Sequence, residues 1–110
     1  MTRLQKEIRT ISELIRTKYK PEKIILFGSV ARGDFEAGSD LDFFVVKNTR
    51  LPRHKRIEYL YGLLYGANRA NPVDFIAYTP KELKVRQDMG DFFVGNILEE
   101  GKVLYESKKH

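Results

Sequence analysis

The 110-residue chain has no cysteine and no apolar run long enough to cross a membrane. The lack of cysteine excludes disulfide bonds, zinc sites with cysteine ligands and catalysis by a thiol, and it is compatible with a reducing cytosol. The N-terminal residues 1–6 lack the apolar core of a signal peptide. We therefore expect a cytoplasmic protein that is not associated with a membrane.

Internal repeats, low-complexity tracts and linker-like segments are also absent, so we expect one domain over residues 1–110. Apolar residues make up 42% of the chain and charged residues 32%, which is typical of folded domains. The formal net charge of +5 favours polyanionic partners such as nucleotides or RNA, or an acidic protein surface. Charge alone does not establish such binding, because many small basic proteins bind no nucleic acid.

Three short runs rich in β-branched and aromatic residues are typical of buried strands: 23–27, 41–46 and 73–78. A fourth run, 102–106, alternates between apolar and polar residues and predicts a short last strand. We expect an α/β fold with a small mixed β-sheet, in which the first two strands are antiparallel neighbours.

Helices are predicted between these strands. Apolar spacing and a Thr-x-x-Gln capping pattern predict a helix over about 3–19. Proline at a first turn predicts further helices from Pro52 and from Pro80, and another helix ends at Gly101. The predicted buried stripe of the second helix is Ile57, Leu60, Tyr61 and Leu64. We expect the helices to pack on one side of the sheet.

The link between the first two strands has features of a phosphate-binding turn. Gly28 follows the first strand, and glycine allows both a sharp turn and the close approach of a ligand. Ser29 stands where a short helix begins, and Gly33 ends it. The unpaired N–H groups and partial positive charge of a helix N-terminus suit a phosphate group.

Three aspartates lie in or beside the predicted strands. Asp40 and Asp42 are two residues apart, so their side chains point to the same face and repel each other unless a cation lies between them. Such hard oxygen ligands suit Mg²⁺. Asp74 is the only charged residue in the third strand, and a carboxylate in a buried strand needs a partner. A salt bridge to an arginine or lysine is one possible partner.

A basic cluster stands at the start of the second predicted helix. Its members are Arg50, Arg53, Lys55 and Arg56. The cluster is either a solvated helix face or a contact for a triphosphate, an RNA or a protein partner, and the sequence leaves both open.

The segments Gly28-Ser29, Ala31-Arg32-Gly33 and Ser39-Asp40-Leu41-Asp42 follow one another at fixed spacing. This pattern resembles the signature of the polymerase-β-like nucleotidyltransferase superfamily, and the small size of the chain points to its minimal nucleotidyltransferase branch. The resemblance covers the chain from the first strand to the third. A lone Gly-Ser or Asp-x-Asp would be a weak signal, whereas the combination is specific.

The resemblance implies a Mg²⁺-dependent enzyme that moves a nucleoside monophosphate from a nucleoside triphosphate to a hydroxyl group. It implies that Asp40 and Asp42 bind two Mg²⁺ ions. Asp74 would bind the catalytic ion and help to deprotonate the acceptor. The implied nucleotide-binding residues are Gly28, Ser29, Arg32 and Ser39. For Arg32, a contact to the triphosphate and a structural pair with an acidic residue both remain open.

The resemblance also implies an acceptor. Minimal nucleotidyltransferases resemble antitoxins encoded beside HEPN-type ribonuclease toxins, and such enzymes can transfer AMP from ATP to a tyrosine of the toxin. We therefore expect ATP as co-substrate, a HEPN-type toxin as partner and an antitoxin role. The alternative is a non-catalytic nucleotide-binding module that inhibits its partner by covering it.

The sequence also bears on two further kinds of partner. An RNA-binding domain is not favoured, because no strand face interleaves aromatic and basic residues as a stacking platform would. A homodimer, or the complex with a toxin, is favoured by a surplus of helical aromatic residues. These residues are Tyr59, Tyr65, Phe92 and Phe93.

Overall fold

The computed structural model describes residues 1–33, 38–67 and 70–108. Its elements, in chain order, are α1 (Arg3–Leu14), the π-helical turn η1 (Ile15–Tyr19), β1 (Lys23–Phe27), α2 (Gly28–Arg32), β2 (Leu41–Val46), α3 (Arg53–Leu63), β3 (Val73–Tyr78), α4 (Pro80–Asp88), α5 (Phe92–Glu100) and β4 (Lys102–Glu106). Among these described elements, no helix has both the length and the apolarity that a membrane span requires. The four strands predicted from the sequence are confirmed, with the predicted bounds.

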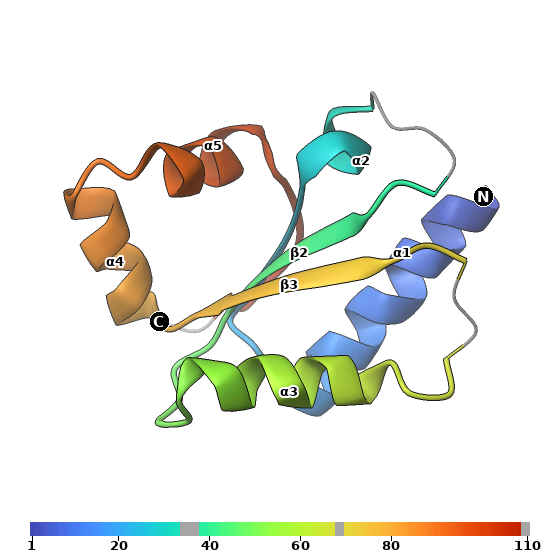
Figure 1. Cartoon of the computed structure of the whole chain (residues 1–110), viewed down its shortest axis with the longest axis horizontal. Helices are drawn as coiled ribbons and strands as arrows, with labels where there is room; N and C mark the ends of the chain where they lie inside the picture. The colour runs from blue at the N-terminus through green and yellow to red at the C-terminus, as the bar shows by residue number, and fades with distance from the viewer. Residues whose placement is uncertain (34–37, 68–69, 109–110) are drawn as a thin grey trace.

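The four strands form one mixed sheet in the order β3-β2-β1-β4 (Figure 1). β1 is antiparallel to both β2 and β4, while β2 is parallel to β3. The register pairs Asp42 of β2 with Phe27 at the end of β1 and with Asp74 of β3. The α/β fold and the antiparallel pairing of the first two strands are confirmed, and the register brings three predicted site segments to one edge.

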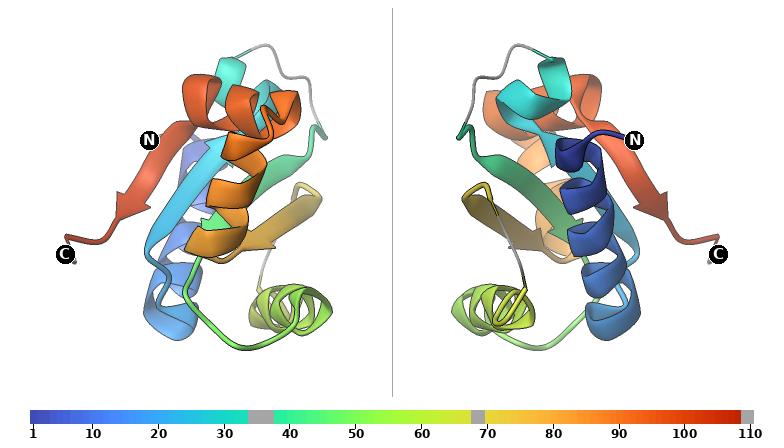
Figure 2. Two further views of the ribbon diagram at one scale, coloured as in Figure 1. Left: turned by 90° about the vertical axis from the view of Figure 1, so that its left-hand side faces the viewer. Right: turned by 90° about the vertical axis from the view of Figure 1, so that its right-hand side faces the viewer.

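Helices cover both faces of the sheet, so the expectation of helices on one side is wrong. Figures 1 and 2 show α1 and α3 on one face and α4 and α5 on the other. The larger core, on the face of α1 and α3, includes Ile11, Ile15, Ile24, Leu26, Phe43, Val45 and Leu60. The smaller core is formed by Ile25, Phe44, Val46 and Ile97. Successive residues of β1 and β2 are apolar on both faces, so each face requires a cover.

Side-chain capping contacts stabilise the N-termini of two predicted helices, α1 and α4. The Thr2 side chain accepts a hydrogen bond from the Gln5 N–H, and Gln5 accepts one from the Thr2 N–H. Thr79 and Glu82 form the same reciprocal pair at the start of α4. The first helix does reach Tyr19 as predicted, but its last turn is π-helical. Each reciprocal pair satisfies two N–H groups that the helix itself leaves free.

Candidate functional site

The turn between β1 and α2 brings the chain against a carboxylate. Gly28 has a φ of +81°, a conformation that side chains rarely adopt. A Cβ atom at this position would also collide with the carboxylate of Asp42. Gly28 is therefore required both by its backbone conformation and by the close approach of Asp42. Ser29 follows it directly on α2, as predicted.

The three predicted aspartates come together at the end of the sheet. One carboxylate oxygen from each of Asp40, Asp42 and Asp74 lies within 4.8 Å of the others. Asp42 is half-buried, whereas Asp40 and Asp74 are exposed. Among the described residues, no arginine or lysine pairs with Asp74. The expectation that Asp74 is buried is wrong. β3 is an edge strand of the sheet, and its second residue, Asp74, faces solvent.

The cluster concentrates negative charge. Burial, together with the charges of Asp74 and Asp40, raises the pKa of Asp42 to about 6, while Arg32 opposes this shift. A divalent cation among the three oxygens would offset this repulsion. Three hard oxygen donors at this spacing fit Mg²⁺ in ligand type and in reach.

Tyr61 of α3 is a site residue that the sequence did not identify. Its hydroxyl donates a hydrogen bond to Oδ1 of Asp74 at 3.2 Å, and its ring packs edge-to-face on Phe75. Burial and the charge of Asp74 raise the pKa of the Tyr61 hydroxyl, so it remains a neutral donor. Apolar periodicity placed Tyr61 in a buried stripe, but the side chain is exposed and reaches over β3 to the site.

A second missed residue holds the segment that carries the first aspartate. The Asn71 amide donates a hydrogen bond to the Ser39 carbonyl at 3.0 Å, and the Leu41 N–H donates one to the Pro72 carbonyl at 2.8 Å. These two bonds tie the start of β2 to the start of β3. They position the backbone on either side of Asp40.

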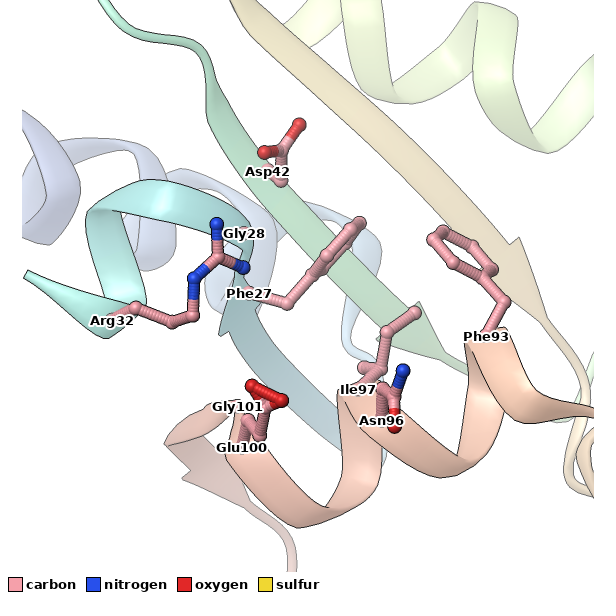
Figure 3. A pocket seen from close by; sticks show the side chains of 9 residues that line it. All are labelled: Phe27, Gly28, Arg32, Asp42, Phe93, Asn96, Ile97, Glu100 and Gly101. Atoms are coloured by element: carbon pink, nitrogen blue, oxygen red, sulfur yellow. The ribbon is translucent and has the colours of Figure 1, made fainter. Parts of the chain in front are cut away.

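A cavity of about 330 Å³ adjoins the cluster (Figure 3). Its wall includes Gly28, Arg32 and Asp42 on one side and residues of α5 on the other. Figure 3 shows the Arg32 side chain reaching from α2 toward the turn at Gly28. The cavity thus begins where the carboxylates and the turn meet.

One member of the basic cluster is neither solvated nor available to a ligand. Arg56 is 5% exposed, and its guanidinium donates to the Leu51 carbonyl at 2.7 Å, to the Ala77 carbonyl at 3.2 Å and to the Glu82 carboxylate at 2.7 Å. Arg53 lies over the ring of Tyr78. For Arg56 both predicted roles are wrong, because it joins α3 to α4 through a mostly buried ion pair.

Both sequence and fold match known proteins. A family model described as a nucleotidyltransferase domain matches residues 8–104. A curated relative from Methanocaldococcus jannaschii, "Putative protein adenylyltransferase MJ0604", is 32% identical over 103 residues. This match covers 92% of the present chain and 97% of the relative.

Three crystal structures share the fold. A "putative nucleotidyltransferase" from Sulfolobus solfataricus gives a TM-score of 0.60 at 20% identity, covering 96% of this chain and 88% of that one. A toxin–antitoxin structure with AMP-PNP gives 0.58 at 23% identity, and a mutant of the toxin–antitoxin MntA–HpeT gives 0.54 at 20%. Each of the last two matches covers 91% of this chain and 73% of the other.

Proposed function

Because the chain belongs to the nucleotidyltransferase domain family, we propose that it transfers AMP from ATP to a hydroxyl group of a partner protein. The observation that carries this proposal is the convergence of Asp40, Asp42 and Asp74 beside the Gly28 turn. The M. jannaschii relative, whose name is "Putative protein adenylyltransferase MJ0604", supports a protein as acceptor and ATP as donor.

The placement of the site residues supports the following proposed roles. Ser29 and the N–H groups that follow Gly28 bind the outer phosphates, and Arg32 on the cavity wall contacts the triphosphate. The three carboxylates would hold two Mg²⁺ ions, which would supply charge neutralisation of the triphosphate and stabilisation of the entering and leaving oxygens. Gly28 allows the Asp42 carboxylate to lie directly against the turn, because a Cβ atom at position 28 would collide with it.

The reaction forms one bond and breaks one. The acceptor oxygen attacks the α-phosphorus of ATP, the bond from that phosphorus to the bridging oxygen breaks, and pyrophosphate leaves. The proton of the acceptor hydroxyl passes to the carboxylate of Asp74. Tyr61 fixes the orientation of that carboxylate through its hydrogen bond to Oδ1, so that Oδ2 is directed to the acceptor.

We infer that the acceptor is a tyrosine of a HEPN-type toxin and that the chain acts as its antitoxin. Two fold neighbours are toxin–antitoxin structures, one of them with AMP-PNP, which supports this inference. The second candidate, inhibition by covering the partner without transfer, is favoured by exposed aromatic residues such as Phe92 and Tyr65.

Asp74→Asn separates these two functions. The asparagine keeps the size of the side chain and an Oδ1 acceptor for the Tyr61 hydroxyl, so the shape of the surface is preserved while the proton acceptor is lost. Cells that carry the toxin should be protected by the wild-type chain and not by Asp74→Asn, although both bind the toxin in a pull-down assay. Asp88→Asn, which changes an exposed carboxylate on α4, is the matched control and should protect. Full protection by Asp74→Asn would favour inhibition by covering.

A further inference from the structure

The cavity beside Asp42 has two chemically different ends (Figure 3). One end carries the charged groups of Arg32 and Glu100. At the other end lie the rings of Phe27 and Phe93, with the amide of Asn96 close by. This aromatic end does not serve the binding of phosphates or metal ions.

Phe93 presents part of its ring to this cavity. It is 56% exposed, although it lies on the first turn of a helix whose Val94 and Ile97 are buried. Its ring meets Phe27 edge-to-face, with centroids 6.0 Å apart and planes at 87°. Since Phe27 directly precedes Gly28, the aromatic end of the cavity adjoins the turn that contacts the carboxylates. An exposed aromatic face beside such a turn is a platform for a planar ring.

Asn96 stands three residues after Phe93, so both side chains lie on the same face of α5. Among the described residues, the Asn96 amide has no hydrogen-bond partner. An amide offers a donor and an acceptor side by side. Adenine presents a matching acceptor and donor at N7 and N6, whereas guanine presents two acceptors at N7 and O6.

We propose that this cavity binds the nucleobase of the triphosphate, with the base stacked on Phe93 and its N6/N7 edge bound by Asn96, so that the site selects adenine. The inference rests on the proposed nucleotidyl transfer and names the residues that choose its donor. The cavity volume of about 330 Å³ is at the lower end of small-molecule sites, which suits a base with its sugar rather than a whole nucleoside triphosphate. The phosphates then extend past Gly28 toward the three carboxylates.

Calorimetric titration of ATP, GTP and inorganic triphosphate, each with Mg²⁺, tests the assignment. Phe93→Ala should weaken ATP and GTP binding roughly 5- to 150-fold, the loss expected for one base stacked on an aromatic ring, and leave triphosphate binding unchanged. Asn96→Leu should reduce the preference for ATP over GTP at least about fivefold. Phe92→Ala is the matched control, because Phe92 is 87% exposed and is not part of the cavity wall. Phe92→Ala should bind ATP, GTP and inorganic triphosphate with the affinities of the wild type.

Phe93→Leu keeps an apolar side chain against Phe27 and removes only the aromatic face. Phe93→Leu therefore replaces Phe93→Ala in the titration if circular dichroism shows that the alanine variant has a lower melting temperature than the wild type. Wild-type affinity in Phe93→Leu, an equal loss of triphosphate binding, or an unchanged ATP preference in Asn96→Leu would overturn the inference. If the wild type transfers AMP while these variants behave as it does, the function stands and the base site is wrong. A folded wild type that binds no nucleoside triphosphate refutes both.

Discussion

Replacing Glu82 by glutamine tests the ion pair that joins α3 to α4. The Glu82 carboxylate accepts hydrogen bonds from the Arg56 guanidinium at 2.7 Å and 3.2 Å. Arg56 is almost fully buried, so it depends on Glu82 for neutralisation. Glutamine can still complete the capping pair with Thr79, because this motif accepts either residue at its fourth position. The substitution therefore removes the charge and keeps the helix cap.

The expected loss is about 2 kcal/mol of unfolding free energy. Breaking a fully buried ion pair by removing one partner costs about 3–5 kcal/mol. The Glu82 side chain is 34% exposed, and solvent screening reduces that figure. The glutamine oxygen also keeps one hydrogen bond from the guanidinium. For a chain of this size, about 2 kcal/mol corresponds to a melting temperature lower by roughly 6–12 °C.

Urea denaturation at pH 7 and at pH 3 measures the effect and its pH dependence. The hydrogen bond from Arg56 lowers the pKa of Glu82 below its usual value of 4.5. A lowered carboxylate pKa contributes stability that is present above the unfolded-state pKa and is lost as the pH falls through the folded-state pKa. The difference in unfolding free energy between the wild type and Glu82→Gln should therefore be largest at pH 7 and should decrease below pH 4.5.

Glu58→Gln is the control, because Glu58 lies on the same helix as Arg56 in a weak exposed pair with Lys55. It should change the unfolding free energy by less than about 0.5 kcal/mol. A Glu82→Gln variant as stable as this control at pH 7, or a gap that widens in acid, would refute the role given to Arg56.

Three further predictions concern the site. Gly28→Ala should abolish nucleotide binding, because its Cβ would meet the Asp42 carboxylate, while Gly33→Ala, which has a similar φ but open space around it, should bind nucleotide in calorimetry. Asp42→Asn should melt at the same or a higher temperature than the wild type without metal at pH 7.5. In the wild type Asp42 is ionised above its pKa of about 6, and the raised pKa means that this charge destabilises the folded state, so the difference should shrink as the pH falls below that value. Tyr61→Phe should slow AMP transfer about fivefold or more by releasing the Asp74 carboxylate, with little change in melting temperature; transfer at the wild-type rate would remove Tyr61 from the mechanism.

The sequence predicts the aspartate cluster because local rules determine it. Period-two alternation places Asp40 and Asp42 on one face, and the short link through Gly28 makes β1 and β2 neighbours. The position of Asp74 across from Asp42 agrees with the family resemblance, although its exposure depends on β3 being an edge strand.

The remaining features depend on contacts between distant segments. Tyr61 reaches Asp74 only because of the way α3 packs along β3, which helical periodicity does not specify. Arg56 is buried because α4 begins directly after β3, which brings Glu82 to the guanidinium. The apolar residues on both faces of β2 require two covering layers, which the expectation of helices on one side overlooked, and the sequence does not specify which helices supply them.

Label transfer from ATP tests the central claim most directly. The chain should be incubated with Mg²⁺ and a lysate of its host, once with ATP labelled at the α-phosphorus and once with ATP labelled at the γ-phosphorus. The account predicts that a protein takes up the α-label and not the γ-label, and that Asp42→Asn transfers neither. Uptake of the γ-label, or equal transfer by Asp42→Asn, would contradict nucleotidyl transfer at the three carboxylates.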